Sequence, residues 1–236
     1  MGRAFEYRRA AKEKRWATMS RIFPKISRTI TIAVKEGGPD PEMNAKLRMA
    51  IQAGKAANMP KDNVENAIKR ASTKDSEDYT EVNYEGKGPA GVLVFVECAT
   101  DNVTRTIANV KSYFNKLNGS LVATGSLEFM FDRKTVVEFE RPENFDPDEF
   151  ELEMIDFGLQ SFEVDENTIY AYGDYTDFGT LTKAFEEKGI NITKANLQRI
   201  PTTPTEFSDE QMVDIEKLLD KLDDDDDVQA VYTNLA

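Results

Sequence analysis

The chain of 236 residues contains no histidine and one cysteine, Cys98. Without histidine it lacks the usual general base of serine and cysteine hydrolases, the commonest metal ligand and the side chain that most often moves protons near neutral pH. A single cysteine excludes an internal disulfide and any zinc or iron–sulfur site built from several thiolates, as is typical of a reducing compartment. We therefore expect a cytoplasmic protein without a bound metal or other cofactor.

Long apolar runs are missing as well. No stretch approaches the roughly 20 residues that span a bilayer, and residues 1–9 lack the apolar core of a secretory signal. Hydrophobic residues nevertheless make up 40% of the chain and aromatic residues 10%, which is enough for true hydrophobic cores. The sequence therefore indicates a folded protein that does not enter a membrane.

Catalysis has little support in this composition. The chain has 43 aspartates and glutamates, so carboxylates at short spacing arise by chance and no pair can be chosen as a general acid and base. Cys98 lies inside the apolar run of residues 92–99 and is expected to be a small buried residue, not a nucleophile. We expect a protein that is not an enzyme, and no small-molecule substrate is evident.

The two parts of the chain carry opposite charge. Residues 1–74 contain 17 lysines and arginines against 7 aspartates and glutamates, whereas residues 75–236 contain 13 against 36. A concentrated positive field attracts phosphates even in a protein whose net charge is −13. The amino-terminal third is therefore the predicted nucleic-acid-binding part, and the acidic remainder limits how far a polyanion can wrap.

The candidate nucleic-acid contacts are the cations of the first 28 residues and three from a later predicted helix. They are Arg3, Arg8, Arg9, Lys12, Lys14, Arg15, Arg21, Lys25, Arg28, Lys61, Lys69 and Arg70. Phe5, Tyr7 and Trp16 are interleaved with the first of them, a mixture suited to phosphate contacts and to stacking on unpaired bases. The alternative is a basic arm that docks on the protein's own acidic domains or on an acidic protein partner.

Apolar residues at three- and four-residue intervals predict three short helices in the first third of the chain. The first ends at the glycine pair of residues 37–38, the second follows a cap at Asp40, and the third begins at Pro60. The polar residues 72–80 are expected to form a linker. The pattern predicts a small helical bundle.

Strand-like and helix-like segments alternate beyond the linker. Residues 91–131 predict a β-α-β unit whose last strand covers residues 126–131, and residues 134–204 follow the β-α-β-β-α-β order of a ferredoxin-like fold. A helix that starts at Ser208 and a strand at residues 228–232 cannot bury their apolar faces alone, so we expect them to return to the first unit.

The predicted fold class is therefore a multidomain α+β protein, with an amino-terminal helical bundle and two α+β domains, one of them ferredoxin-like and inserted in the other. The predicted domains are residues 1–80, residues 81–133 together with 205–236, and the insert of residues 134–204.

Two motifs have both a functional and a structural interpretation. Gly86, Gly88 and Gly91 match the phosphate-binding pattern G-x-G-x-x-G, but they lead into a strand where that pattern requires a helix, so a turn is predicted. The five consecutive aspartates of residues 223–227 lack the glycine turn and the distant glutamate of an EF-hand calcium site. A solvated loop is predicted there.

Several sequence blocks form a family pattern. They are residues 35–42 (Lys-Glu-Gly-Gly-Pro-Asp-Pro-Glu); residues 56–64 with Ala67, Ile68, Lys69 and Arg70; Tyr84, Glu85, Gly86, Gly88, Pro89 and Gly91; Glu97, Cys98, Asp101, Asn102, Arg105 and Thr106; Gly125 and Ser126 with residues 129–131; and the aspartate-rich turn before residues 228–232. In this order they resemble the YebC family, and the resemblance covers nearly the whole chain. At its start the chain departs from the family, because the basic character is kept at Arg8, Arg9 and Lys12 but the family's histidine and early tryptophan are absent.

The resemblance implies three domains, one inserted in another, and a non-enzymatic role in gene expression. Members have been described as transcriptional regulators, some are ribosome-associated factors that help translation through difficult stretches such as consecutive prolines, and mitochondrial relatives are translational activators of cytochrome oxidase. We favour ribosomal RNA or tRNA over duplex DNA, because the sequence shows no helix with base-reading side chains clustered at its start and no sign of dimer symmetry. A DNA-binding transcriptional regulator is the alternative.

Overall fold

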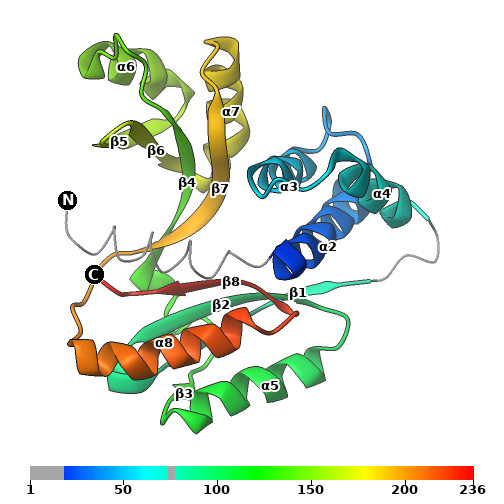
Figure 1. Ribbon diagram of the computed structural model, residues 1–236, viewed down its shortest axis with the longest axis vertical. Coiled ribbons are helices and arrows are strands. Elements are labelled where there is room, and N and C mark those ends of the chain that lie inside the picture. The colour runs from blue at the N-terminus through cyan, green and yellow to red at the C-terminus, as the bar shows by residue number, and fades with distance from the viewer. Residues whose placement is uncertain (1–18, 74–77) are drawn as a thin grey trace.

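The computed structural model describes residues 19–73 and 78–236, which form a helical unit and two four-stranded sheets (Figure 1). The helical unit contains α2 (Met19–Gly37), α3 (Ala45–Ala56) and α4 (Lys61–Ala71). One apolar stripe from each helix meets in a common core that includes Ile30, Leu47 and Ala67. The predicted helical bundle is therefore present, built from the spacing that a 3.6-residue period requires.

Asn44 fixes the turn between the first two helices. Its side-chain oxygen accepts a hydrogen bond from the backbone N–H of Leu47 at 3.0 Å, as an N-cap does, while its amide donates to the carbonyls of Ala33 and Gly38. The prediction of a cap at Asp40 was therefore wrong, because α3 begins only after Asn44. A buried asparagine joins α2 to α3 through three hydrogen bonds.

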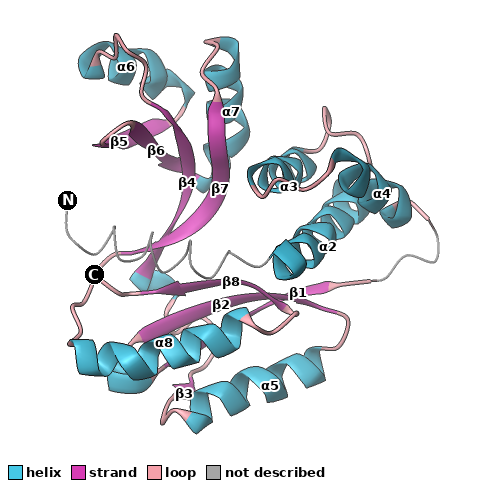
Figure 2. Cartoon of the chain, viewed as in Figure 1, coloured by secondary structure: helices cyan, strands magenta, loops and turns pink. Residues whose placement is uncertain are grey.

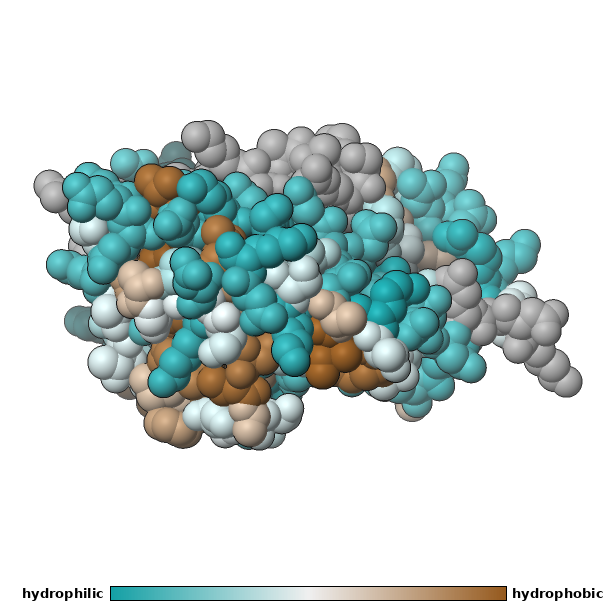
Figure 3. Space-filling view, turned by 90° about the horizontal axis from the view of Figure 1, so that it is seen from below, coloured by the Kyte–Doolittle hydropathy of each residue, from teal (hydrophilic) through white to brown (hydrophobic). Residues whose placement is uncertain are grey.

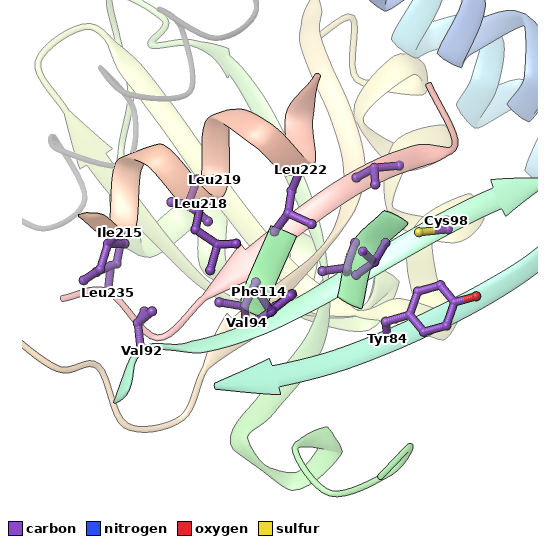
Figure 4. Close-up of a cluster of buried hydrophobic side chains, with 13 residues drawn as sticks. Tyr84, Val92, Val94, Cys98, Phe114, Ile215, Leu218, Leu219, Leu222 and Leu235 are labelled. Atoms are coloured by element: carbon purple, nitrogen blue, oxygen red, sulfur yellow. The ribbon is translucent and has the colours of Figure 1, made fainter. Parts of the chain in front are cut away.

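The first sheet has the strand order β3-β1-β2-β8. Its strands are β1 (Thr80–Lys87), β2 (Leu93–Thr100), β3 (Ser120–Leu121) and β8 (Val228–Thr233), all antiparallel to their neighbours. Helices α5 (Val103–Lys116) and α8 (Asp209–Asp223) cover one face, as Figure 2 shows. Between the helices and the sheet lies a core that includes Val94, Phe114 and Leu218 (Figure 4).

The outer side of α5 and α8 is mostly hydrophilic, with smaller apolar patches between the polar side chains (Figure 3). Val103 and Ile107 of α5 and Val213 of α8 are exposed apolar residues. Helix α8 has its N-cap at Ser208, where the sequence predicted the start of a helix. It begins with a capping box, since Ser208 accepts from the backbone of Gln211 and the Gln211 side chain accepts from the backbone of Ser208.

The second sheet has the order β5-β6-β4-β7, formed by β4 (Phe131–Glu140), β5 (Leu159–Asp165), β6 (Thr168–Asp174) and β7 (Ile192–Pro201). With α6 (Pro147–Met154) and α7 (Phe178–Glu187) it follows the β-α-β-β-α-β order along the chain. This is the ferredoxin-like arrangement that the sequence predicted. Because β8 pairs with β2 after this sheet is complete, the second sheet is an insertion in the first α+β unit.

One predicted strand was wrong. Residues 126–131 do not form the last strand of a β-α-β unit, because Glu128–Met130 is a turn of 3-10 helix and Phe131 already begins β4. Leu127 and Phe131 both pack on Phe95, on the face of the first sheet away from α5 and α8, while Phe129 is 74% exposed. Strands β1 and β3 of the first sheet were not predicted from the sequence.

Candidate nucleic-acid interface

The predicted cations fall into three groups in the structure. Arg3, Arg8, Arg9, Lys12, Lys14 and Arg15 lie outside the described residues. Arg21 lies in the first turn of α2. Lys61, Lys69 and Arg70 lie on the exposed side of α4, whereas Lys25 and Arg28 lie on the side of α2 that faces the first sheet.

The exposed face of α4 carries charges of both signs. Lys61 lies 3.5 Å from Glu65, an exposed pair one helical turn apart that contributes little to stability. Arg70 donates from Nε to the backbone carbonyl of Asn66, and Asp62 occupies the first turn of the helix. Val64 and Ala67 face the core, so the three cations of α4 point away from it. The α4 surface can contact phosphates, but it is not uniformly positive.

Lys25 and Arg28 are engaged within the protein. Lys25 donates from Nζ to the carbonyl of Asp223 at 2.9 Å. Arg28 donates to the carbonyls of Ala99 and Asp226, both at 2.7 Å, and to Oδ1 of Asp227 at 3.0 Å. Both cations were predicted from the sequence as nucleic-acid contacts, whereas the structure gives them intramolecular acceptors.

Asp227 is the centre of this contact. Its side chain is 4% exposed, and it accepts hydrogen bonds from Arg105 (Nη2 to Oδ2, 2.8 Å), Thr106 (2.7 Å) and Thr100 (3.1 Å) in addition to Arg28. Burial alone would raise the pKa of Asp227, but the hydrogen bonds from Arg105, Thr106 and Thr100 outweigh burial and lower the pKa below its usual value. The carboxylate is therefore held ionised between two guanidinium groups.

The prediction of a solvated loop at residues 223–227 was wrong for this aspartate. Asp225 also has specific partners, because it accepts from the hydroxyl of Tyr113 at 2.9 Å and from the backbone N–H of Asp227. Burial and the hydrogen bond to Asp225 raise the pKa of Tyr113 to about 12. We call residues 223–227 the aspartate turn; it is an ordered connection between α8 and β8.

A cleft of about 560 Å³ opens beside the aspartate turn. Arg28, Tyr79, Arg105 and Asn109 line it, together with Asp101 and the last three residues of the turn. The Arg28 guanidinium lies 4.7 Å from the centre of the Tyr79 ring, a cation–π contact that limits where this side chain can go. Because four carboxylates face two arginines, the cleft is net acidic and does not have the charge of a phosphate pocket.

Two further contacts join the units. Met49 of α3 packs against the core of the ferredoxin-like sheet. Arg199 of β7 donates to Glu97 of β2 at 2.8 Å and lies 3.9 Å above the Phe95 ring, so it connects the two sheets. The helical unit thus contacts both sheets. Its contact with the first sheet includes the polar one between α2 and the aspartate turn.

The other candidate motifs have structural roles. Gly86 is in the last part of β1, and the predicted turn before β2 is formed by residues 88–91. A Cβ atom at Gly86 would meet the Phe114 ring at 2.4 Å, so this glycine is needed for packing. Cys98 is buried, which confirms that part of its prediction, and burial raises the pKa of its thiol to about 12.

Across residues 19–73 and 78–236, no three side chains of Cys, Asp or Glu are grouped so that they could hold a metal ion. Within the same residues, no helix has the length and apolar character of a membrane span.

No function was predicted from the sequence for Tyr79, Thr100 or Asp227. Arg105 and Thr106 belonged to the family pattern without a role, and that pattern was the signal that could have drawn attention to them. Thr100, Arg105 and Thr106 all donate to Asp227, which immediately precedes β8.

The helical unit and the two sheets, one inserted in the other, define a multidomain α+β protein whose helical unit meets the first sheet at the two arginines around the buried Asp227. The chain belongs to the TACO1/YebC family. Residues 3–74 match the TACO1/YebC protein N-terminal domain, and residues 79–235 match the TACO1/YebC second and third domain.

Curated relatives match over the whole length of both chains. A probable transcriptional regulatory protein of Wolinella succinogenes is 64% identical over 237 residues, and one of Helicobacter hepaticus is 62% identical over 240 residues, each covering 100% of both sequences. A crystal structure of a conserved hypothetical protein from Aquifex aeolicus is 34% identical, with a TM-score of 0.79 over 93% of this chain and 91% of that one. The fold class predicted from the sequence is thereby confirmed.

Proposed function

We propose that the protein is a non-enzymatic regulator of gene expression that binds nucleic acid through its basic amino-terminal part. The observation that carries the proposal is the charge distribution, with 17 cations against 7 anions in residues 1–74 and 13 against 36 in the remainder. Gathering so many like charges in one part of a small protein favours a polyanionic partner. The names of the curated relatives, as regulatory proteins, support the same class of function.

Within this class we favour a ribosome-associated translation factor that contacts ribosomal RNA or tRNA and assists elongation at difficult stretches such as consecutive prolines. A recognition helix that reads DNA bases enters the major groove with its first turn. In α4 the first turn contains Asp62, whose charge is repelled by the phosphates that border the groove. A protein that recognises RNA by its shape and through its phosphates and 2′-hydroxyls does not need to insert a helix into the major groove.

The alternative is a DNA-binding transcriptional regulator that uses the same cations. The names of the curated relatives favour it directly, because they specify transcription. In either case we propose three domains, formed by residues 1–80, by residues 81–133 with 205–236, and by residues 134–204, with the first as the nucleic-acid-binding domain.

The test is co-sedimentation with purified ribosomes, run beside binding to random duplex DNA at the same salt concentration. One variant replaces Arg8, Arg9, Lys12, Lys14 and Arg15 by glutamine. The matched control replaces five exposed lysines of the acidic domains by glutamine, namely Lys111, Lys116, Lys183, Lys217 and Lys221, so both variants lose the same charge.

We expect the first variant to lose ribosome association and the control to keep it. An equal loss of ribosome association in both variants would mean that only the net charge of the protein matters. It would refute the proposal that the amino-terminal cations form the binding surface. Binding of the wild type to duplex DNA as tightly as to ribosomes would favour the transcriptional alternative.

A further inference from the structure

The contact between α2 and the aspartate turn joins two groups of opposite charge from distant parts of the chain. The backbone carbonyls and the carboxylate of the turn accept from Lys25 and Arg28 at 2.7–3.0 Å. These two cations are among those that the sequence predicts as phosphate contacts. The same side chains therefore have two classes of acceptor, one inside the protein and one on nucleic acid.

We propose that the aspartate turn competes with nucleic acid for α2, so that it withholds Lys25 and Arg28 until a polyphosphate backbone displaces it and releases the helical unit from the first sheet. The inference rests on the proposed function and adds a means of regulation to the same surface.

The bonding of Asp227 makes such a release feasible. When Arg28 leaves, Asp227 keeps Arg105, Thr100 and Thr106, all of which belong to its own α+β unit. Removing the only cation from a buried carboxylate costs about 3–5 kcal/mol. A carboxylate that keeps a guanidinium and two hydroxyl donors still has partners for its charge, so the cost is smaller. The turn therefore stays ordered after α2 has separated from it.

Release is also favourable for Lys25 and Arg28. Burial lowers the pKa of Lys25 and outweighs the attraction of Asp223, Asp225 and Asp226, so its ammonium group is poorly solvated in the present contact. Arg28 exchanges two carbonyls and one carboxylate oxygen for phosphate oxygens, which accept from a guanidinium in a bidentate manner.

The joint between the two units is polar. Besides Lys25 and Arg28, Thr29 of α2 donates to the side-chain oxygen of Gln229 at 3.3 Å, and Lys46 of α3 pairs with Glu81 of β1 at 2.8 Å. The apolar core of the helices and the core beneath α5 and α8 are separate. An interface of ion pairs and hydrogen bonds can be displaced by a competing polyanion more readily than a shared core.

The first test compares Asp227→Asn with Asp101→Asn in binding to a fluorescent oligouridylate. Both changes remove one negative charge from a partner of Arg105, but only Asp227 also contacts Arg28. We expect Asp227→Asn to bind the RNA about fivefold more tightly than Asp101→Asn at the same salt concentration. Equal affinities would overturn the proposal.

The second test measures opening in the otherwise unaltered protein, so it does not depend on the folding of an Asp227 variant. Donor and acceptor dyes are attached at Asn66→Cys on α4 and Lys221→Cys on α8, both exposed positions, while Cys98 is buried with a pKa of about 12 and remains unlabelled near neutral pH. Saturating oligouridylate should lower the energy transfer of this pair. A control pair at Lys111→Cys and Lys221→Cys, within one unit, should not change.

Unchanged transfer between α4 and α8 at saturating RNA would contradict the release, even if RNA binds. If the wild-type protein bound neither RNA nor DNA, the proposed function would be refuted. The proposed competition between the aspartate turn and nucleic acid would then be refuted as well. The two failures are therefore distinguished by whether binding is observed.

Discussion

Replacing Asp227 by asparagine tests how much the arginine–aspartate cluster stabilises the fold. The change keeps the size of the side chain and removes the charge that faces Arg28 and Arg105. Breaking a buried ion pair from one side costs about 3–5 kcal/mol. The Arg105 side chain is 46% exposed and regains water, which reduces the loss. We therefore expect the free energy of unfolding to fall by about 2–3 kcal/mol.

Urea denaturation followed by circular dichroism measures this difference, and its pH dependence identifies the cause. The folded pKa of Asp227 is lowered, so its contribution is fully present above the unfolded pKa of about 3.9 and is lost as the pH falls through the folded pKa below that value. The gap between wild type and Asp227→Asn should be constant near neutral pH and close below about pH 4. A gap under about 1 kcal/mol at neutral pH would refute the account of the cluster.

Three further changes test the structure elsewhere. Asn44→Ala should lower the free energy of unfolding by about 2–3 kcal/mol in urea denaturation, because the buried carbonyl of Ala33 and the half-buried carbonyl of Gly38 lose their amide donor. A loss of about 0.3 kcal/mol would mean that water replaces the amide. Gly86→Ala should cost about 1–3 kcal/mol, since the added methyl meets the Phe114 ring at 2.4 Å, and an unchanged midpoint would contradict that packing. Cys98 should react with a maleimide near neutral pH only when the protein unfolds, because burial raises its pKa to about 12, and fast labelling of the native protein would disprove its burial.

Local pattern was sufficient for most of the fold. The apolar spacing in α2 and α4, the hairpin between β5 and β6, and the capping box at Ser208 depend on residues within a few positions of each other, and the structure has all of them. The order of strands and helices was then enough to predict a ferredoxin-like insert. The wrongly predicted strand at residues 126–131 shows the limit of local pattern. Leu127 and Phe131 pack on Phe95 from the two ends of a 3-10 turn, and a short apolar run does not distinguish such a turn from a strand.

The cluster around Asp227 could not be predicted from the sequence, because it is formed by residues far apart in the chain. A run of five aspartates is equally consistent with a loop in water and with a buried acceptor, and nothing near Asp227 in sequence decides between them. Its partners Arg28 and Arg105 lie 199 and 122 residues away. Charge composition could predict a basic amino-terminal part, but it could not predict which cations of that part are already bound within the protein.

The dependence of RNA affinity on salt tests the central claim most directly. If about six phosphates are neutralised by the amino-terminal cations, the logarithm of the association constant should fall with the logarithm of salt concentration at a slope of roughly −4 to −5. In the variant without the charges of Arg8, Arg9, Lys12, Lys14 and Arg15 the slope should approach about −1, whereas the control that lacks five lysines of the acidic domains should keep the wild-type slope. The same slope in both variants would contradict a nucleic-acid surface at the amino-terminal end of the protein.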